Sequence, residues 1–166
     1  MRRILIFSLV LVSFVLGSAQ SENKLEWLPF GKAREKSRQE KKIMLTYIYS
    51  TGCGWCRRFW RTTLTNPEVE KMIAEHFVAT KINLSSNKKV ELNGKLFSER
   101  QIGAMFAVRG TPTTIFISPS DTILAKLPGY MPVEQFKIVL KYFGEGWYKD
   151  MSYQEFLESE RKLNNK

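Results

Sequence analysis

The sequence has 166 residues, of which 43% are hydrophobic and 25% are charged. This is the composition of a globular chain; it excludes disordered, collagen-like and coiled-coil proteins, and the length favours one domain. The net charge is +10, and two cysteines with one histidine exclude a disulfide-rich miniprotein and a histidine-rich metal site.

The N-terminus has the three parts of a secretory signal peptide. Arg2 and Arg3 give a positive start, Ile4–Leu16 is almost wholly apolar, and Gly17-Ser18-Ala19 offers small residues for cleavage. The apolar stretch is shorter than the roughly 20 residues that a membrane-spanning helix needs, and an uncleaved anchor is the alternative. We therefore expect residues 1–19 to be removed and the protein to act in the periplasm or after secretion.

The hydrophobic pattern of the remaining chain predicts strands separated by helices. Helices are expected over residues 32–42, 53–64, 67–76, 98–106 and 132–143, with a short last helix after Met151. Strands are expected over residues 43–49, 77–84, 113–117 and 122–127, and the polar residues 85–96 are expected to form a loop. Helices between strands imply parallel crossovers, and the last two strands imply a hairpin. The expected fold class is α/β, a mixed central β-sheet flanked by helices on both faces.

Two of the helices have clear start signals, because Ser98 with Gln101 and Ser152 with Glu155 have the spacing of a capping box.

The expected helices and strands divide the chain into four parts. The expected parts are a signal peptide (1–19), an N-terminal linker (20–30), a single folded domain (31–145) and a C-terminal helical tail (146–166).

The motif that carries chemistry is Cys53-Gly54-Trp55-Cys56, at the junction of the first strand and a helix. Its spacing brings the two sulfurs within bonding reach on one helical turn. Cys53 falls at the helix N-terminus, where unpaired N–H groups and the helix dipole favour a thiolate. Because thiolates attack disulfides, Cys53 is the expected nucleophile and the deeper Cys56 the resolving cysteine. Arg57 adds positive charge, and no cofactor beyond this redox pair is implied.

The two cysteines have other possible uses. A purely structural disulfide remains an alternative, although a loop this short constrains the unfolded chain little. A zinc site lacks four protein ligands, because His76 is the only histidine. Covalent haem attachment needs a histidine after the second cysteine, where this chain has Arg57. His76 itself is expected to end a helix and interact with its dipole rather than act as a base.

Two segments resemble the thioredoxin superfamily. Tyr49–Cys56 is similar to the active-site junction of these proteins, and Val108–Thr113 is similar to their loop with a cis-proline beside the disulfide. Gly129 matches a family glycine near the same site. The resemblance covers about residues 30–145 and is strongest to exported thioredoxin-related proteins tied to sulfur oxidation and cytochrome maturation. It implies a thioredoxin fold and a thiol:disulfide oxidoreductase.

The resemblance also implies roles for single residues. Thr111 and Pro112, joined by a cis bond, take the place of the loop whose backbone docks an extended substrate peptide. Gly54 and Trp55 form the active-site loop, and Trp55 either contacts the partner or covers the site as a half-buried lid. Lys81 matches a lysine on the second strand near the buried sulfur.

One residue departs from the family pattern. Thioredoxins carry a buried aspartate six residues before the first cysteine, and this chain has Tyr47 there. The carboxylate that takes a proton from the resolving thiol is therefore missing, and the candidates to replace it are the Tyr47 hydroxyl, Glu40 and water. Tyr47, Lys81 and Arg57 are thus expected to tune the redox pair.

The expected partners are protein disulfides or dithiols. The Gly-Trp pair between the cysteines lacks the histidine found in many strong oxidants and isomerases of the superfamily, which favours a reductant served by a membrane thiol donor. An oxidant, an isomerase and a non-catalytic binding module remain alternatives. Residues 32–42 are basic but contain no aromatic residue, so we expect a solvated face and no nucleic-acid binding. The protein is expected to be a monomer.

Overall fold

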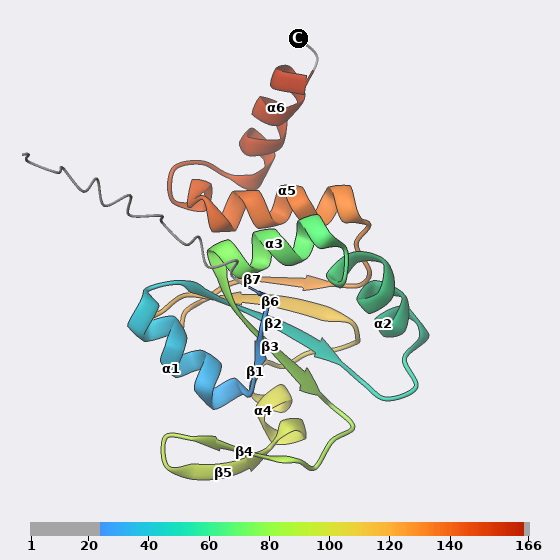
Figure 1. The fold of residues 1–166 in the computed structure, drawn as a ribbon, viewed down its shortest axis with the longest axis vertical. Helices are drawn as coiled ribbons and strands as arrows, with labels where there is room; N and C mark the ends of the chain where they lie inside the picture. The colour runs from blue at the N-terminus through green and yellow to red at the C-terminus, as the bar shows by residue number, and fades with distance from the viewer. Residues whose placement is uncertain (1–23, 165–166) are drawn as a thin grey trace, which may run out of the picture.

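A computed structural model describes residues 24–164 of the chain (Figure 1). The expected signal peptide, residues 1–19, lies outside these residues. None of the helices in the described part of the chain is long and apolar enough to cross a lipid bilayer.

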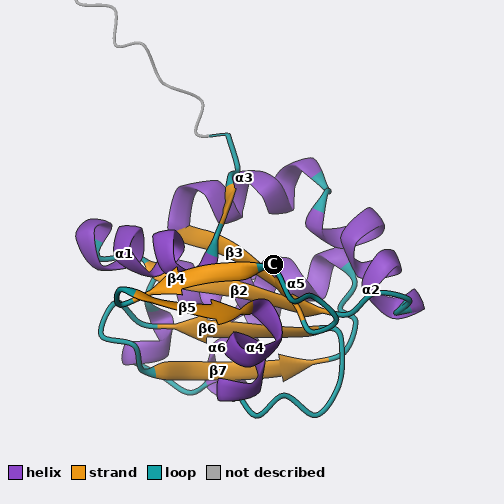
Figure 2. Cartoon of the chain, turned by 90° about the horizontal axis from the view of Figure 1, so that it is seen from below, coloured by secondary structure: helices purple, strands orange, loops and turns teal. Residues whose placement is uncertain are grey.

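The centre of the fold is a five-stranded mixed sheet in the order β1-β3-β2-β6-β7. Figure 2 labels the strands β3, β2, β6 and β7 of this sheet. The strands β1, β3 and β2 are parallel, β6 pairs antiparallel with β2, and β7 pairs antiparallel with β6. A separate two-stranded hairpin contains β4 and β5. The strands are β1 (Trp27–Leu28), β2 (Ile43–Tyr49), β3 (Phe77–Asn83), β4 (Lys89–Leu92), β5 (Lys95–Ser98), β6 (Thr113–Ile117) and β7 (Ile123–Pro128).

Helices cover both faces of this sheet, as expected (Figure 1). The α-helices are α1 (Phe30–Glu40), α2 (Gly54–Phe59), α3 (Pro67–His76), α4 (Glu99–Met105), α5 (Val133–Gly144) and α6 (Tyr153–Asn164). A π-helical turn η1 (Trp60–Leu64) continues α2, and a short 3-10 turn η2 (Trp147–Lys149) links α5 to α6.

The alternation of side chains along β2 builds two cores. Leu45 and Tyr47 belong to the core under α2, α3 and α5, and Met44 and Ile48 belong to the core under α1 and α4. Nearly every residue of β2 is buried, which is the pattern of a central strand covered on both faces. The tail joins the first core, because Phe156 of α6 is 1% exposed and packs beside Tyr142 of α5.

The sequence-based interpretation was wrong in the segment 85–96. The segment expected to be a loop contains β4 and the first two residues of β5, joined by Asn93 and Gly94 with φ values of 54° and 73°. Positive φ at two successive residues is the geometry of a tight hairpin turn, and Asn-Gly is its favoured sequence. The hairpin packs Val90, which is 7% exposed, against the core under α1 and α4.

Three smaller differences concern the ends of elements. The segment 20–30 was expected to be a linker, but its Trp27–Leu28 forms edge strand β1 and pairs with β3. The first helix runs two residues earlier than expected and ends where Lys41 takes a left-handed conformation, φ 55°. The single helix expected over 53–64 changes to a π-helical turn after Phe59.

Candidate active site

Cys53 lies between the end of β2 and the start of α2. Gly52 makes the turn with φ +85°, which a side chain would strain, and Cys53 then caps the N-terminus of α2. Cys53 and Cys56 are joined by a disulfide, and the Cys56 backbone N–H donates to Cys53 Sγ at 3.0 Å. Cys53 is half-buried, whereas Cys56 is 3% exposed. A partner therefore reaches Cys53 before Cys56.

The loop before β6 lies against the same sulfur. The Thr111–Pro112 bond is cis, as the resemblance implied, and the Thr111 carbonyl oxygen is 3.5 Å from Cys53 Sγ. The hydroxyls of Ser50 and Thr111 hydrogen-bond at 2.8 Å and join this loop to the end of β2. The Gly129 N–H donates to the Pro112 carbonyl at 2.8 Å, so the expected neighbourhood of Gly129 is confirmed.

Trp55 is 56% exposed, so it is not a half-buried lid. Its ring lies 5.7 Å from the ring of Tyr130, and the Arg58 guanidinium carbon is 5.3 Å from the Trp55 ring and 5.1 Å from the Tyr130 ring. The pKa of Tyr130 is lowered, first by its hydrogen bond with Thr62 and also by the charge of Arg58. The result is an exposed aromatic surface beside Cys53 that carries a positive charge.

Tyr47 occupies the position of the missing aspartate, under the redox pair. It is 2% exposed, and its hydroxyl donates to the Cys56 carbonyl at 3.0 Å. Burial, with a smaller effect of Tyr49, raises the pKa of Tyr47 well above its ordinary value, so this phenol is neutral at physiological pH. Glu40 is not a substitute: it precedes β2, at the end of the strand opposite to Cys53, and faces Lys36 and Lys42 at 3.8 and 3.6 Å.

A pocket of about 520 Å³ opens beside the disulfide, on the β3 side of β2. Both cysteines line it, together with the aromatic residues Tyr47, Tyr49 and Trp60 and the cationic residues Arg57, Arg61 and Lys81. The Lys81 ammonium lies 4.5 Å from the centre of the Trp60 ring. The structure thus places three expected tuning residues, Tyr47, Arg57 and Lys81, around one pocket with Cys56.

Sequence reasoning missed two members of this pocket. Trp60 and Arg61 line the pocket, but neither is among the residues expected at the site. The available signal was their spacing: Trp60 follows Cys56 by one helical turn, and Arg61 follows Arg57 in the same way. Lys81 reaches the pocket because the β2–β3 register pairs it with Tyr47. This register depends on contacts between distant segments and not on a local sequence signal.

His76 lies outside the site. It is the last residue of α3, as expected, and its nearest carboxylate is that of Glu75 at 4.0 Å. No group of three or more His, Cys, Asp or Glu side chains within residues 24–164 has the arrangement of a metal site.

Several solved structures share this architecture. A thioredoxin-fold protein from Helicobacter pylori is 32% identical, with a TM-score of 0.62 over 86% of this chain and 87% of that chain. A thioredoxin from Thermus thermophilus is 21% identical, with a TM-score of 0.58 over 71% of this chain and 85% of that chain, and shows likeness of fold.

Curated relatives are much longer. Human spermatogenesis-associated protein 20 is 29% identical over 135 residues, which are 75% of this chain but 16% of that protein, so the chain spans about a sixth of its length. The model of the thioredoxin-like domain family matches residues 30–144. From its C-x-x-C disulfide, its cis-proline loop and this match, the chain belongs to the thioredoxin-like family.

Proposed function

We propose that this protein is a thiol:disulfide oxidoreductase that reduces disulfides of exported proteins. The observation that carries the proposal is the placement of Cys53: its sulfur accepts a hydrogen bond from the Cys56 N–H at 3.0 Å and lies 3.5 Å from the Thr111 carbonyl. The first contact stabilises negative charge on the sulfur, and the second puts an open backbone segment beside it.

The reaction is a pair of thiol–disulfide exchanges. In the dithiol form the Cys53 thiolate attacks one sulfur of the substrate disulfide, which forms a mixed disulfide and releases the other substrate sulfur as a thiolate. Cys56 then loses its proton and attacks Cys53 Sγ, which releases the second substrate thiolate and restores the Cys53–Cys56 disulfide. Two electrons pass to the substrate, and a dithiol donor must return them.

The buried resolving thiol has to give up its proton without the aspartate. Tyr47 is a poor acceptor, because its phenol is neutral and its proton is engaged by the Cys56 carbonyl. The pocket beside the disulfide, which both cysteines line, supplies a route for water to Cys56. We propose that water takes the proton and that Arg57 and Lys81 favour the thiolate through their charge.

The residues between the cysteines favour transfer of electrons to the substrate. Gly54 and Trp55 bring no charge to the Cys53 thiolate, so its stabilisation is moderate and the dithiol remains reducing. Arg57 acts in the opposite direction, but it is exposed and screened by salt. The signal-peptide pattern of residues 1–19 supports export, and a membrane thiol donor is the proposed source of electrons.

Turnover of a protein disulfide with excess dithiol tests the function. The wild-type protein accelerates reduction of a fluorescent disulfide-linked peptide, and the Cys53→Ser/Cys56→Ser variant leaves only the uncatalysed rate. The exposed Trp55 reports the redox change as a reversible shift in fluorescence. A wild-type rate equal to that of the double variant contradicts the enzyme and favours the binding module.

A further inference from the structure

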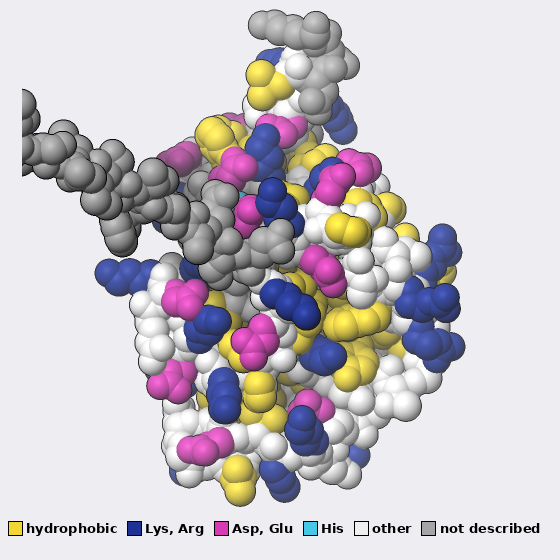
Figure 3. Space-filling model, in the orientation of Figure 1, with side chains coloured by type: hydrophobic (Ala, Val, Ile, Leu, Met, Phe, Trp, Pro, Cys, Tyr) yellow, Lys and Arg dark blue, Asp and Glu magenta, His cyan; other side chains and the backbone are white. Residues whose placement is uncertain are grey.

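The pocket beside the disulfide has an apolar wall and a cationic rim. Tyr47 and Tyr49 stack at 5.4 Å between ring centres, and Tyr47 lies 5.9 Å from Trp60. In Figure 3 a hydrophobic patch lies beside α2 and is bordered by the Lys and Arg side chains that gather over this helix. This pocket lies on the β3 side of the redox pair. Trp55, Tyr130 and the cis-proline loop are not among the residues that line it.

The cations of the rim form no ion pair with a side chain in the described part of the chain. No carboxylate of the described residues lies within 4.0 Å of the side-chain nitrogens of Arg57, Arg61 or Lys81. No acidic residue lines the pocket. The charge of Glu99 contributes to the raised pKa of Tyr49, after the larger effect of burial. The pocket therefore presents three uncompensated positive charges to a ligand.

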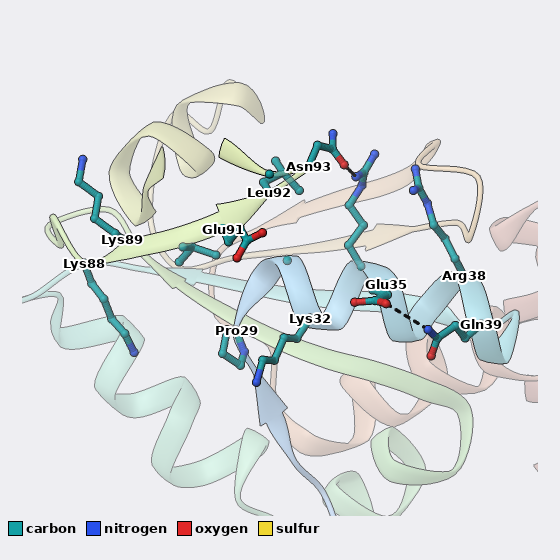
Figure 4. Close-up of a pocket in the computed structure, with 14 residues that line it drawn as sticks. Pro29, Lys32, Glu35, Arg38, Gln39, Lys88, Lys89, Glu91, Leu92 and Asn93 are labelled. Carbon is teal, nitrogen blue, oxygen red and sulfur yellow. Dashed lines mark hydrogen bonds between the residues drawn. The ribbon is translucent and has the colours of Figure 1, made fainter. Parts of the chain in front are cut away.

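A second hollow differs from this pocket because acidic side chains line it. The hollow of about 590 Å³ between α1 and β4 also contains lysines, but Glu35 and Glu91 enter it from its two walls (Figure 4). Its Arg34 is already bound to Asp121 at 2.7 Å and to Asn93 at 2.7 Å. Its lining thus includes two carboxylates beside five cationic side chains, and it has no redox group.

We infer that the pocket beside the disulfide binds an acidic side chain of the protein substrate, so that the protein selects disulfides whose cysteine is flanked by Asp or Glu. The inference rests on the proposed function. Both cysteines line the pocket, so its occupant lies within one or two residues of the attacked sulfur, given about 3.3–3.6 Å of reach per extended residue. The carboxylate contacts the three cations, and its methylene groups pack on Tyr49 and Trp60.

Charge complementarity of this kind acts mainly on encounter and orientation. We expect kcat/KM for a peptide disulfide with Glu on both sides of the cysteine to exceed that of the Gln peptide by on the order of tenfold at low salt. Added salt reduces this ratio, because the rim is open to solvent.

The test uses two variants of equal charge. Arg57→Gln/Arg61→Gln/Lys81→Gln removes the cations of the pocket, and Lys32→Gln/Lys88→Gln/Lys89→Gln removes three from the hollow of Figure 4. In the first variant the ratio of kcat/KM for the Glu peptide to that for the Gln peptide falls close to one. In the control variant this ratio stays at the wild-type value. The single variant Arg61→Gln, at an exposed position, lowers this ratio at least twofold. It replaces the triple variant in the test if the triple variant does not fold.

A binding measurement separates this inference from the proposed function. Cysteine-free Glu and Gln peptides are titrated into the disulfide form by calorimetry, with free glutamate as a third ligand. Tighter binding of the Glu peptide to the wild type, but not to the pocket variant, supports the inference. This result stands even if no disulfide is turned over, because absence of turnover contradicts only the proposed enzymatic function. Equal binding of the Glu and Gln peptides, an unchanged ratio in the pocket variant, or binding of free glutamate as tight as that of the peptide overturns it.

Discussion

The hydroxyl of Tyr47 donates a hydrogen bond to the backbone carbonyl of Cys56 at 3.0 Å. This bond holds the first turn of α2 against the sheet, because Tyr47 lies on β2 and is only 2% exposed. The position that carries an acid in thioredoxins thus supports the backbone of the resolving cysteine in this chain.

Replacing Tyr47 with Phe tests this structural role. The Cys56 carbonyl also accepts from the Trp60 N–H, so it stays partly satisfied and the free energy of unfolding falls by about 1 kcal/mol. The exchange rate and its pH profile remain those of the wild type, because a neutral phenol is not the proton acceptor. Denaturant unfolding and peptide-disulfide turnover measure the two effects.

Tyr49→Phe is the matched control, since the described residues offer its hydroxyl no hydrogen-bond partner. A Tyr47→Phe variant with normal stability but a shifted pH profile would show that the phenol handles the proton after all.

The elements that sequence predicts well are those whose signals are local. The buried run Ile43–Tyr49 and the capping box of Ser98 and Gln101 appear in the structure as expected. The redox motif was predicted from its spacing at a strand–helix junction, whereas the cis-proline loop was predicted through the resemblance to the thioredoxin superfamily. The signals for all of these features lie within a few adjacent residues.

The features that sequence missed depend on contacts between distant segments. Hairpin β4–β5 is polar on one side and gains its order from α1, where a Cβ on Gly31 would stand 1.9 Å from the Glu91 carbonyl oxygen. The Asn93-Gly94 pair was the available signal for it. The pocket beside the disulfide needs the register of Tyr47 with Lys81, which periodicity along one strand does not specify.

Trapping of mixed disulfides separates the roles of the two cysteines. Cys53 is the more accessible sulfur and Cys56 is 3% exposed, so Cys56→Ser leaves the nucleophile able to attack but unable to release its partner. This variant accumulates mixed disulfides on non-reducing gels, and Cys53→Ser does not. Alkylation against pH gives Cys53 a pKa below the ordinary thiol value of about 8.5. Accumulation with Cys53→Ser instead would reverse the assignment.

The reduction potential decides the direction of transfer. Equilibration with glutathione is expected to give a value near the roughly −270 mV of thioredoxin, because Gly54 and Trp55 add no charge to the Cys53 thiolate. Trp55→His supplies a cationic neighbour and raises the potential towards the oxidising range. A wild-type value near about −120 mV would make the protein an oxidant.

Asp121 gives the fold an acid-sensitive contact between the β6–β7 turn and α1. Burial acts to raise the pKa of Asp121, but hydrogen bonds and charge from Arg34 and Arg38 outweigh it, so the pKa is lowered. A lowered pKa in the folded state means that the contact stabilises the fold above the ordinary carboxyl value of about 3.9 and is lost as pH falls through the folded pKa.

Asp121→Asn is therefore expected to cost up to about 1 kcal/mol at pH 7, a limit set by the 33% exposure of the side chain. Asparagine suits the left-handed backbone at this position, φ 65°, so the loss reports the charge and not backbone strain. Urea unfolding at pH 7 and pH 3 gives a difference between wild type and variant that shrinks at the lower pH. The control Asp150→Asn, at an exposed position, changes neither value. A difference equal at both pH values would mean that Asp121 acts through packing rather than through its charge.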